Sequence, residues 1–102
     1  MRIESALDKV MKMESVLDEA KRIRSGERNV DYGDAVENFR RITTIANEIT
    51  GLSLRPSDVC RVMLAVKLAR ERHRPKRDNR VDICGYVDIL DLLEQAEAEA
   101  DR

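Results

Sequence analysis

The stretch PSDVCRVMLAVKLARERH, residues 56–73, decides the fold predicted for this chain. Pro56 suits the first turn of a helix because proline lacks an N–H that would stay unbonded there. Asp58 adds a negative charge near the positive end of the helix dipole. Apolar side chains cover most of the circumference of this helix, which is typical of a helix at the centre of a domain or in a subunit interface.

Working outward, apolar residues recur every three or four positions in three further segments, as in amphipathic helices. The four predicted helices cover residues 3–24, 35–50, 56–73 and 79–97. No strand pattern of any length appears, so the predicted fold class is all-α. Short loops between four helices favour an antiparallel four-helix bundle. A chain of 102 residues has room for one domain, and its largely apolar third helix favours completion of the bundle by dimerisation.

Local signals mark where the predicted helices begin and end. Asp34 can cap the second helix, and Glu37 stands three residues later, at the spacing of a capping box. Gly51 suits the left-handed position that ends a helix. In the acidic end, residues 94–101, charged residues alternate with alanine, so we expect that end to fray or stay exposed.

Composition excludes several classes of protein. The chain is 42% hydrophobic and 38% charged, with only three aromatic residues and a net charge of −1. No apolar run approaches the ~18 residues of a membrane span, and no global basic field points to nucleic acid. Cys60 and Cys84 both fall in apolar helical patterns, which fits buried thiols in a reducing compartment. We therefore expect a cytoplasmic helical protein.

The loop that contains Asp31, Tyr32 and Asp34 has two interpretations. It can be a capped turn with Tyr32 lying on the surface of the bundle. It can also face a ligand, with Tyr32 stacked on a flat group and the carboxylates accepting hydrogen bonds or holding a metal. Asn38 follows on the next helix and is a further candidate for ligand binding.

Lys67 and Arg70 interrupt the most apolar helix. They lie three residues apart and therefore share a face. Lys67 borders the apolar side, where its stem can pack while its ammonium group reaches water. The alternative is a cation directed into a cleft, in which Lys67 and Arg70 together would bind a phosphate group.

Asp78, Asp82 and Tyr86 are spaced by four and lie along one side of the fourth helix. Gly85, in the middle of that helix, costs about 1 kcal/mol of helix propensity relative to alanine. It indicates either a tight helix crossing or the close approach of a ligand. If Asp78 and Asp82 face Lys67 and Arg70, the result is a buried ion-pair network or a polar site.

Several short motifs together resemble a family of small phage proteins. This family is similar to proteins associated with nucleotide modification and, more distantly, to all-α nucleotide pyrophosphohydrolases of the MazG type. The motifs are DYGD (31–34), ENF (37–39), DV (58–59), KLAR (67–70) and DICGY (82–86).

The resemblance implies a MazG-like bundle and Mg²⁺ held by carboxylates on helices. It implies Glu37, Asp58 and Asp82 as metal ligands, with Asp58 and Asp82 in the catalytic role. The paired Glu-x-x-Glu of the pyrophosphohydrolases is absent, since Glu37 is followed by Arg40 and Arg41. A magnesium site therefore requires these carboxylates, together with Asp31, to converge in space.

Three functions remain open at this point. The first is Mg²⁺-dependent pyrophosphohydrolysis of a nucleotide whose phosphates contact Lys67 and Arg70 while Tyr32 or Tyr86 stacks on the base. The second is binding of nucleotides or nucleotide signals without catalysis, in the host cytoplasm if a phage encodes the chain. The third is inhibition of a host protein through the basic turn, residues 70–80, or the first helix.

Overall fold

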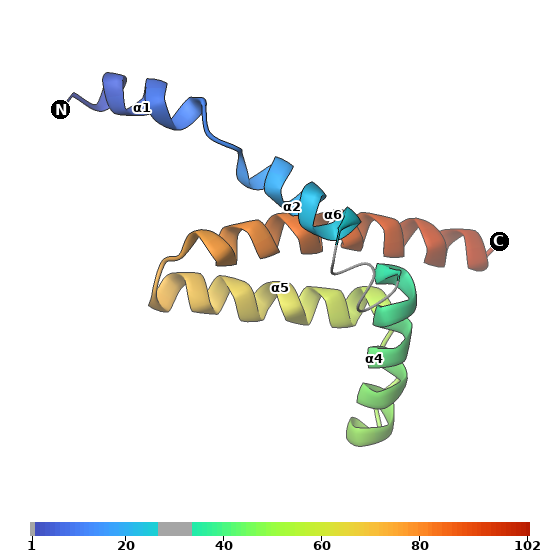
Figure 1. The fold of residues 1–102 in the computed structure, drawn as a ribbon. Helices are drawn as coiled ribbons and strands as arrows, with labels where there is room; N and C mark the ends of the chain where they lie inside the picture. Colours follow the sequence, from blue (N-terminus) through green and yellow to red (C-terminus); the bar gives the residue numbers. More distant parts are fainter. Residues whose placement is uncertain (1, 27–33) are drawn as a thin grey trace.

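The computed structural model of the chain describes residues 2–26 and 34–102. Within these two ranges the secondary structure is helical, with no strand, so the predicted all-α class is confirmed. The helices are α1 (Ile3–Met11), α2 (Val16–Ser25), α4 (Ala35–Thr50), α5 (Pro56–His73) and α6 (Arg77–Ala100) (Figure 1).

The helices α4 and α5 have the bounds predicted for them, and local capping explains most of their ends. The Asp34 carboxylate accepts a hydrogen bond from the Val36 N–H at 2.7 Å at the start of α4. Gly51 ends α4 with a φ of 72°, in the left-handed region. Glu37, expected to complete a capping box, forms an ion pair with Arg40 at 2.8 Å instead.

The first predicted helix, over residues 3–24, is divided into α1 and α2. The Ser15 hydroxyl accepts a hydrogen bond from the Asp18 N–H at 3.1 Å, and this cap starts α2 afresh. A cap at Ser15 competes with a continuous helix because the serine hydroxyl hydrogen-bonds to the backbone more favourably at a cap than in a helix interior. The apolar spacing continues across the break, and it therefore concealed the break in the sequence.

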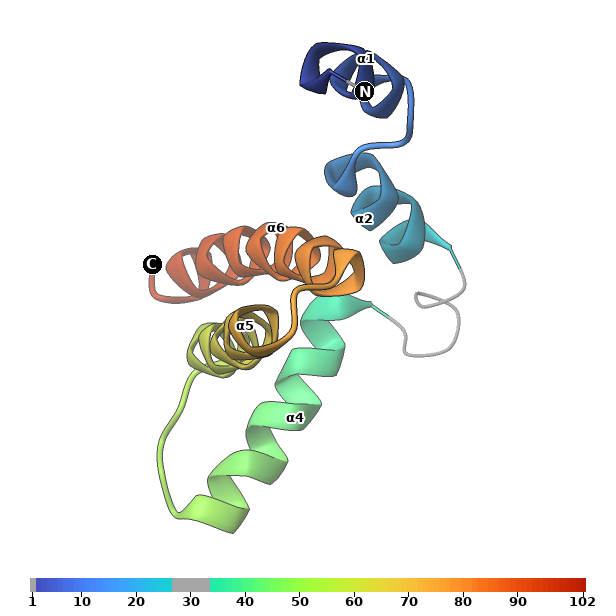
Figure 2. The ribbon, with the colours of Figure 1, turned by 90° about the vertical axis from the view of Figure 1, so that its left-hand side faces the viewer.

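Four helices pack together, and the antiparallel bundle is formed only in part. The helices α5 and α6 lie antiparallel and side by side, and α2 lies on α6 (Figures 1 and 2). The helix α4 contacts both α5 and α6 but runs across them rather than alongside (Figure 1). This crossing leaves space between α2, α4, α5 and α6, in which the candidate site lies.

The core joins α4, α5 and α6. Its buried members are Phe39, Val59, Cys60 and Leu93, and Tyr86 packs against them. The rings of Phe39 and Tyr86 meet edge to face, with centroids 6.1 Å apart. The Cys60 thiol donates to the Tyr86 carbonyl at 3.3 Å, and burial raises the pKa of this thiol to about 11. Cys60 therefore stays protonated and acts as a small core residue.

The acidic end of the chain departs from its prediction at Glu97. The helix α6 continues to Ala100 and most of residues 94–101 are exposed, as expected, but Glu97 is half-buried against the start of α5. Glu97 accepts hydrogen bonds from both the N–H and the hydroxyl of Ser57, at 3.0 and 2.7 Å. Arg55 pairs with Glu97 and with Asp101. Glu97 thus supplies acceptors for the first turn of α5, whose N–H groups have no partner within the helix.

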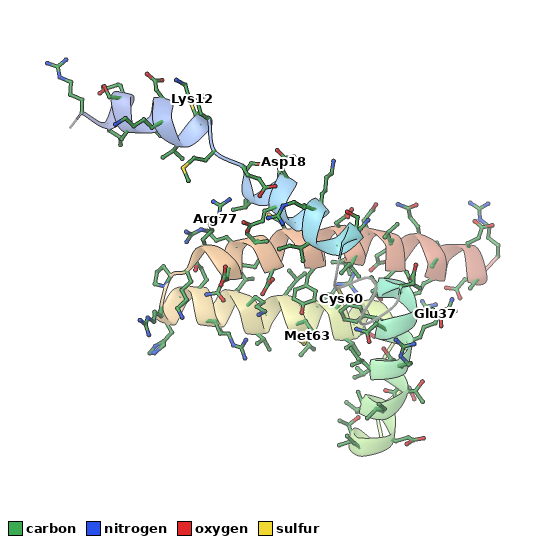
Figure 3. All side chains as sticks on the ribbon, in the orientation of Figure 1. Lys12, Asp18, Glu37, Cys60, Met63 and Arg77 are labelled. Atoms are coloured by element: carbon green, nitrogen blue, oxygen red, sulfur yellow. The ribbon has the colours of Figure 1, made fainter. Side chains whose placement is uncertain are left out.

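The helix α1 makes no contact with another helix of the described chain. Figure 3 shows its side chains, up to Lys12, standing apart from the rest of the molecule. Ile3, Leu7 and Val10 are all at least half exposed. A nine-residue helix is only marginally stable in water by itself. Contact between this apolar face and another molecule would therefore stabilise α1.

Candidate ligand-binding site

Two adjoining cavities lie where α2, α4, α5 and α6 meet. The inner cavity, of about 340 Å³, is mostly apolar and is lined by residues that include Asn38, Phe39, Met63, Lys67, Asp82, Gly85, Tyr86 and Ile89. The outer groove is lined largely by charged and polar residues, which include Glu19, Lys67, Arg70, His73, Arg74, Lys76, Asp78 and Asp82. Lys67 and Asp82 belong to both linings, so they form part of the wall that the two spaces share.

The ion pair between Lys67 and Asp82 is the central polar feature of this wall. The Lys67 Nζ lies 2.8 Å from an Asp82 carboxylate oxygen, and each side chain is only 15% exposed. One alternative offered by the sequence analysis was that Asp82 faces Lys67, and the structure confirms that these two side chains pair. An ammonium group has three donors, so Lys67 can hold Asp82 and still donate to an anionic ligand.

The end of α5 and the following turn bring a group of cations to the outer groove, which Glu19, Asp78 and Asp82 also line. Arg70, Arg74 and Lys76 line it together with His73. Arg70 forms no ion pair with any residue of the described ranges, so its guanidinium is available to an anion. Clustered cations of this kind favour phosphate or carboxylate ligands.

Glu71 fixes the turn that carries these cations. Its carboxylate accepts from the Lys76 N–H at 2.7 Å and from Arg80 at 2.5 Å. The hydrogen bond from the Lys76 backbone, followed by the one from Arg80, lowers the pKa of Glu71 below its usual range. Glu71 therefore stays charged at neutral pH and positions the groove without lining it.

The inner cavity offers an apolar wall and one uncharged amide. Phe39, Met63 and Ile89 contribute apolar surface, and Tyr86 adds a half-buried ring. The amide of Asn38 lines the cavity and makes no side-chain hydrogen bond within the described residues. An amide both donates and accepts, which suits the polar edge of a flat heterocycle.

The carboxylates predicted to hold Mg²⁺ are not brought together. The Asp58 carboxylate accepts from the Arg55 N–H at 2.9 Å and closes the capping box of α5. Asp58 lies nine residues before Lys67, the partner of Asp82, or about 13 Å along the helix axis. Across residues 2–26 and 34–102, no three Asp, Glu, His or Cys side chains form a group that could hold a metal. The predicted trio of Glu37, Asp58 and Asp82 is therefore not gathered within the described residues of one chain.

The other predicted site residues divide by location. Asn38, Lys67 and Tyr86 line the inner cavity, and Arg70 lines the outer groove next to Lys67. Asp31 and Tyr32 lie outside the described residues. The structure thus gathers four of the six predicted ligand-binding residues around one pair of cavities.

Sequence reasoning missed several lining residues. Phe39 and Met63 were not among the predicted site residues, and they serve both the core and the cavity wall. Ile23 of α2 lines both spaces, although only its place on an apolar stripe was visible in the sequence. Asp78 was expected with Asp82 and does line the outer groove. No local signal distinguishes a core residue from one beside a cavity, because that difference depends on how helices cross.

The fold and the cavities define a small all-α domain with a cleft between crossing helices. The chain belongs to the family described as "Domain of unknown function (DUF6378)", whose model matches residues 15–94. The match begins at Ser15, the cap of α2, so it covers the four packed helices up to the last turns of α6 and leaves out α1.

Two curated phage proteins are similar to this chain. The "Gene 55 protein" of Mycobacterium phage L5 is 38% identical over 87 residues, which cover 83% of this chain and 56% of that protein. The "Gene 55 protein" of Mycobacterium phage D29 is 32% identical over 89 residues, which cover 86% of this chain and 59% of that protein. The chain therefore spans less than two thirds of the length of these relatives.

No solved structure matches the chain. None of the described helices is both long and apolar enough to cross a membrane.

Proposed function

We propose that this domain binds a nucleotide without hydrolysing it, with the base in the inner cavity and the phosphates in the outer groove. The observation that carries the proposal is the shared wall, where Lys67 stands between a mostly apolar space and a groove lined by charged residues, Arg70 among them. A nucleotide has the same division into a flat, weakly polar base and a strongly anionic phosphate chain. In this proposal Lys67 and Arg70 bind phosphate, while Asn38 and Tyr86 contact the base.

The resemblance to nucleotide-modification and MazG-type proteins supports the same ligand class but not the same chemistry. Pyrophosphohydrolysis of that type needs a group of carboxylates around Mg²⁺, and the described residues do not form one. Asp58, proposed from sequence as catalytic, is engaged at the start of α5. The proposal therefore includes no Mg²⁺ site and assigns no catalytic residue.

We further propose that the chain forms a homodimer. Support comes from apolar side chains left at the surface: Ile3, Leu7 and Val10 on α1, and Val62 and Leu68 on α5, each at least 50% exposed. Patches of this kind mark association surfaces. Sedimentation velocity is expected to give the mass of two chains at micromolar concentration, and a single-chain mass throughout would contradict the proposal.

Because both curated relatives are phage proteins, we propose that this domain acts in the host cytoplasm.

Thermal unfolding in the presence of nucleotides tests the binding proposal. The panel contains ATP, GTP, CTP, UTP and their deoxy forms, each with and without Mg²⁺. A ligand at a hundred times its Kd adds about 2.7 kcal/mol of stability, which corresponds to a rise in Tm of roughly 10–20 °C for a domain of this size. We expect at least one nucleotide to raise Tm by several degrees and to be recovered with unchanged mass.

Charge reversal on α5 provides the matched control for this panel. Arg70→Glu is expected to remove most of the rise in Tm because it places a negative charge in the outer groove. Arg72→Glu makes the same change of charge on the same helix, but Arg72 lines neither cavity, so the rise should persist. The proposal fails if no nucleotide changes Tm, or if both variants lose the response equally. Release of pyrophosphate would instead support the enzyme, and capture of a host protein without any nucleotide response would support the inhibitor.

A further inference from the structure

Gly85 is the residue of α6 whose presence the protein itself does not explain. Glycine is the least favourable residue in a helix interior apart from proline. Its usual justification, a positive φ, does not apply, because Gly51 is the glycine with positive φ in the described ranges. Close packing does not apply either, since apart from the neighbouring residues and backbone of α6 itself no heavy atom of those ranges lies within 4 Å of where a Cβ at position 85 would stand.

The missing side chain opens the backbone of α6 toward the inner cavity. Gly85 lines that cavity beside Tyr86, and Asn38 and Phe39 line it from α4. The Phe39 and Tyr86 rings meet edge to face, which fixes one side of the space. Gly85 thus leaves helix backbone uncovered in a cavity that Asn38 also lines, and such a combination of backbone and amide suits a planar heterocycle.

We infer that Gly85 is a specificity-determining contact of the site, and that a nucleobase lies against its Cα with the base edge toward Asn38. This inference deepens the proposed function and rests on it. It adds that the ring of the ligand, not its phosphate chain, occupies the space beside α6. A methyl group at position 85 would stand in that space, so it would act on nucleotides but not on a ligand made of phosphate alone.

Alanine and leucine at position 85 test the inference because both favour a helix more than glycine does. Gly85→Ala is expected to raise the Tm of the unliganded protein and to weaken binding of the best nucleotide about tenfold or more, as a misplaced methyl group does in a close-fitting pocket. Gly85→Leu should weaken it further because its side chain fills more of the cavity. Val87→Ala is the control, since Val87 is 54% exposed and lines neither cavity.

Inorganic tripolyphosphate serves as the probe that has phosphate but no base. Its affinity, measured by titration calorimetry, is expected to be the same in wild type, Gly85→Ala and Gly85→Leu. If Gly85→Ala binds the nucleotide as tightly as wild type, the inference is wrong while the proposed function stands. Equal loss of nucleotide and tripolyphosphate would also overturn it, because the effect would then not be on the ring. If wild type binds no nucleotide, both the proposed function and the inference fail.

Discussion

Replacing Leu93 by alanine is expected to lower the free energy of unfolding by about 2–5 kcal/mol. Leu93 is 1% exposed and lies in the buried cluster with Phe39, Val59 and Cys60. Removing its side chain deletes apolar contacts within a cluster that joins α4, α5 and α6, and it leaves a cavity in that cluster. The total free energy of unfolding of a small domain is about 5–15 kcal/mol, so the expected loss is a large fraction of it.

The neighbouring leucine is a matched control for this prediction. Leu92 is 39% exposed, and Leu92→Ala is expected to cost about 1 kcal/mol or less. Urea unfolding followed by far-UV circular dichroism measures both changes. An equal loss in the two variants would contradict the packing of α6 onto α4 and α5 described above.

The second large effect is expected at the ion pair in the shared wall. Lys67→Met keeps the length and apolar stem of the side chain but removes the ammonium group that lies 2.8 Å from Asp82. The Asp82 carboxylate, 15% exposed, then loses that cation, at an expected cost of roughly 1–3 kcal/mol in the free energy of unfolding. The same variant is expected to lose the rise in Tm with nucleotide because Lys67 lines both the inner cavity and the outer groove.

Asp82→Asn separates the two consequences of this change. The double variant Lys67→Met with Asp82→Asn should be more stable than the sum of the single effects predicts, by roughly 0.5–3 kcal/mol. Asp82→Asn alone removes a negative charge beside the proposed phosphate site, so its affinity for nucleotide should be kept or increased. Additive stabilities would show that the two groups do not interact, and loss of nucleotide binding in Asp82→Asn would contradict the assignment of Asp82 as a neighbour of the phosphates.

The parts of the fold that depend on local chemistry were predictable from sequence. Pro56 and Asp58 mark the start of α5, and Asp34 and Gly51 mark the ends of α4. The same locality caused an error, because an acidic residue in the first turn of a helix serves equally well as a cap or as a ligand. Asp58 was given a catalytic role from its motif, and its contact with the Arg55 N–H shows that it caps α5.

The parts that depend on distant contacts were not predictable. The path of α4 across α5 and α6 results from how Phe39 fits against Val59 and Leu93, and no spacing within one helix specifies such a fit. The burial of Glu97 against Ser57 was missed for the same reason, since its alternation with alanine indicated an exposed end. The pairing of Lys67 with Asp82 could be stated only as one alternative until the helices were placed.

The binding of a nucleotide in the inner cavity is tested most directly by a two-dimensional ¹H–¹⁵N NMR titration of the protein with the nucleotide that raises Tm most. The backbone signals of Asn38, Lys67 and Gly85 are expected to shift most, and those of α1 and of the last turn of α6 to stay in place. Saturation without shifts at these three residues, or shifts gathered on α1 instead, would contradict the proposed site.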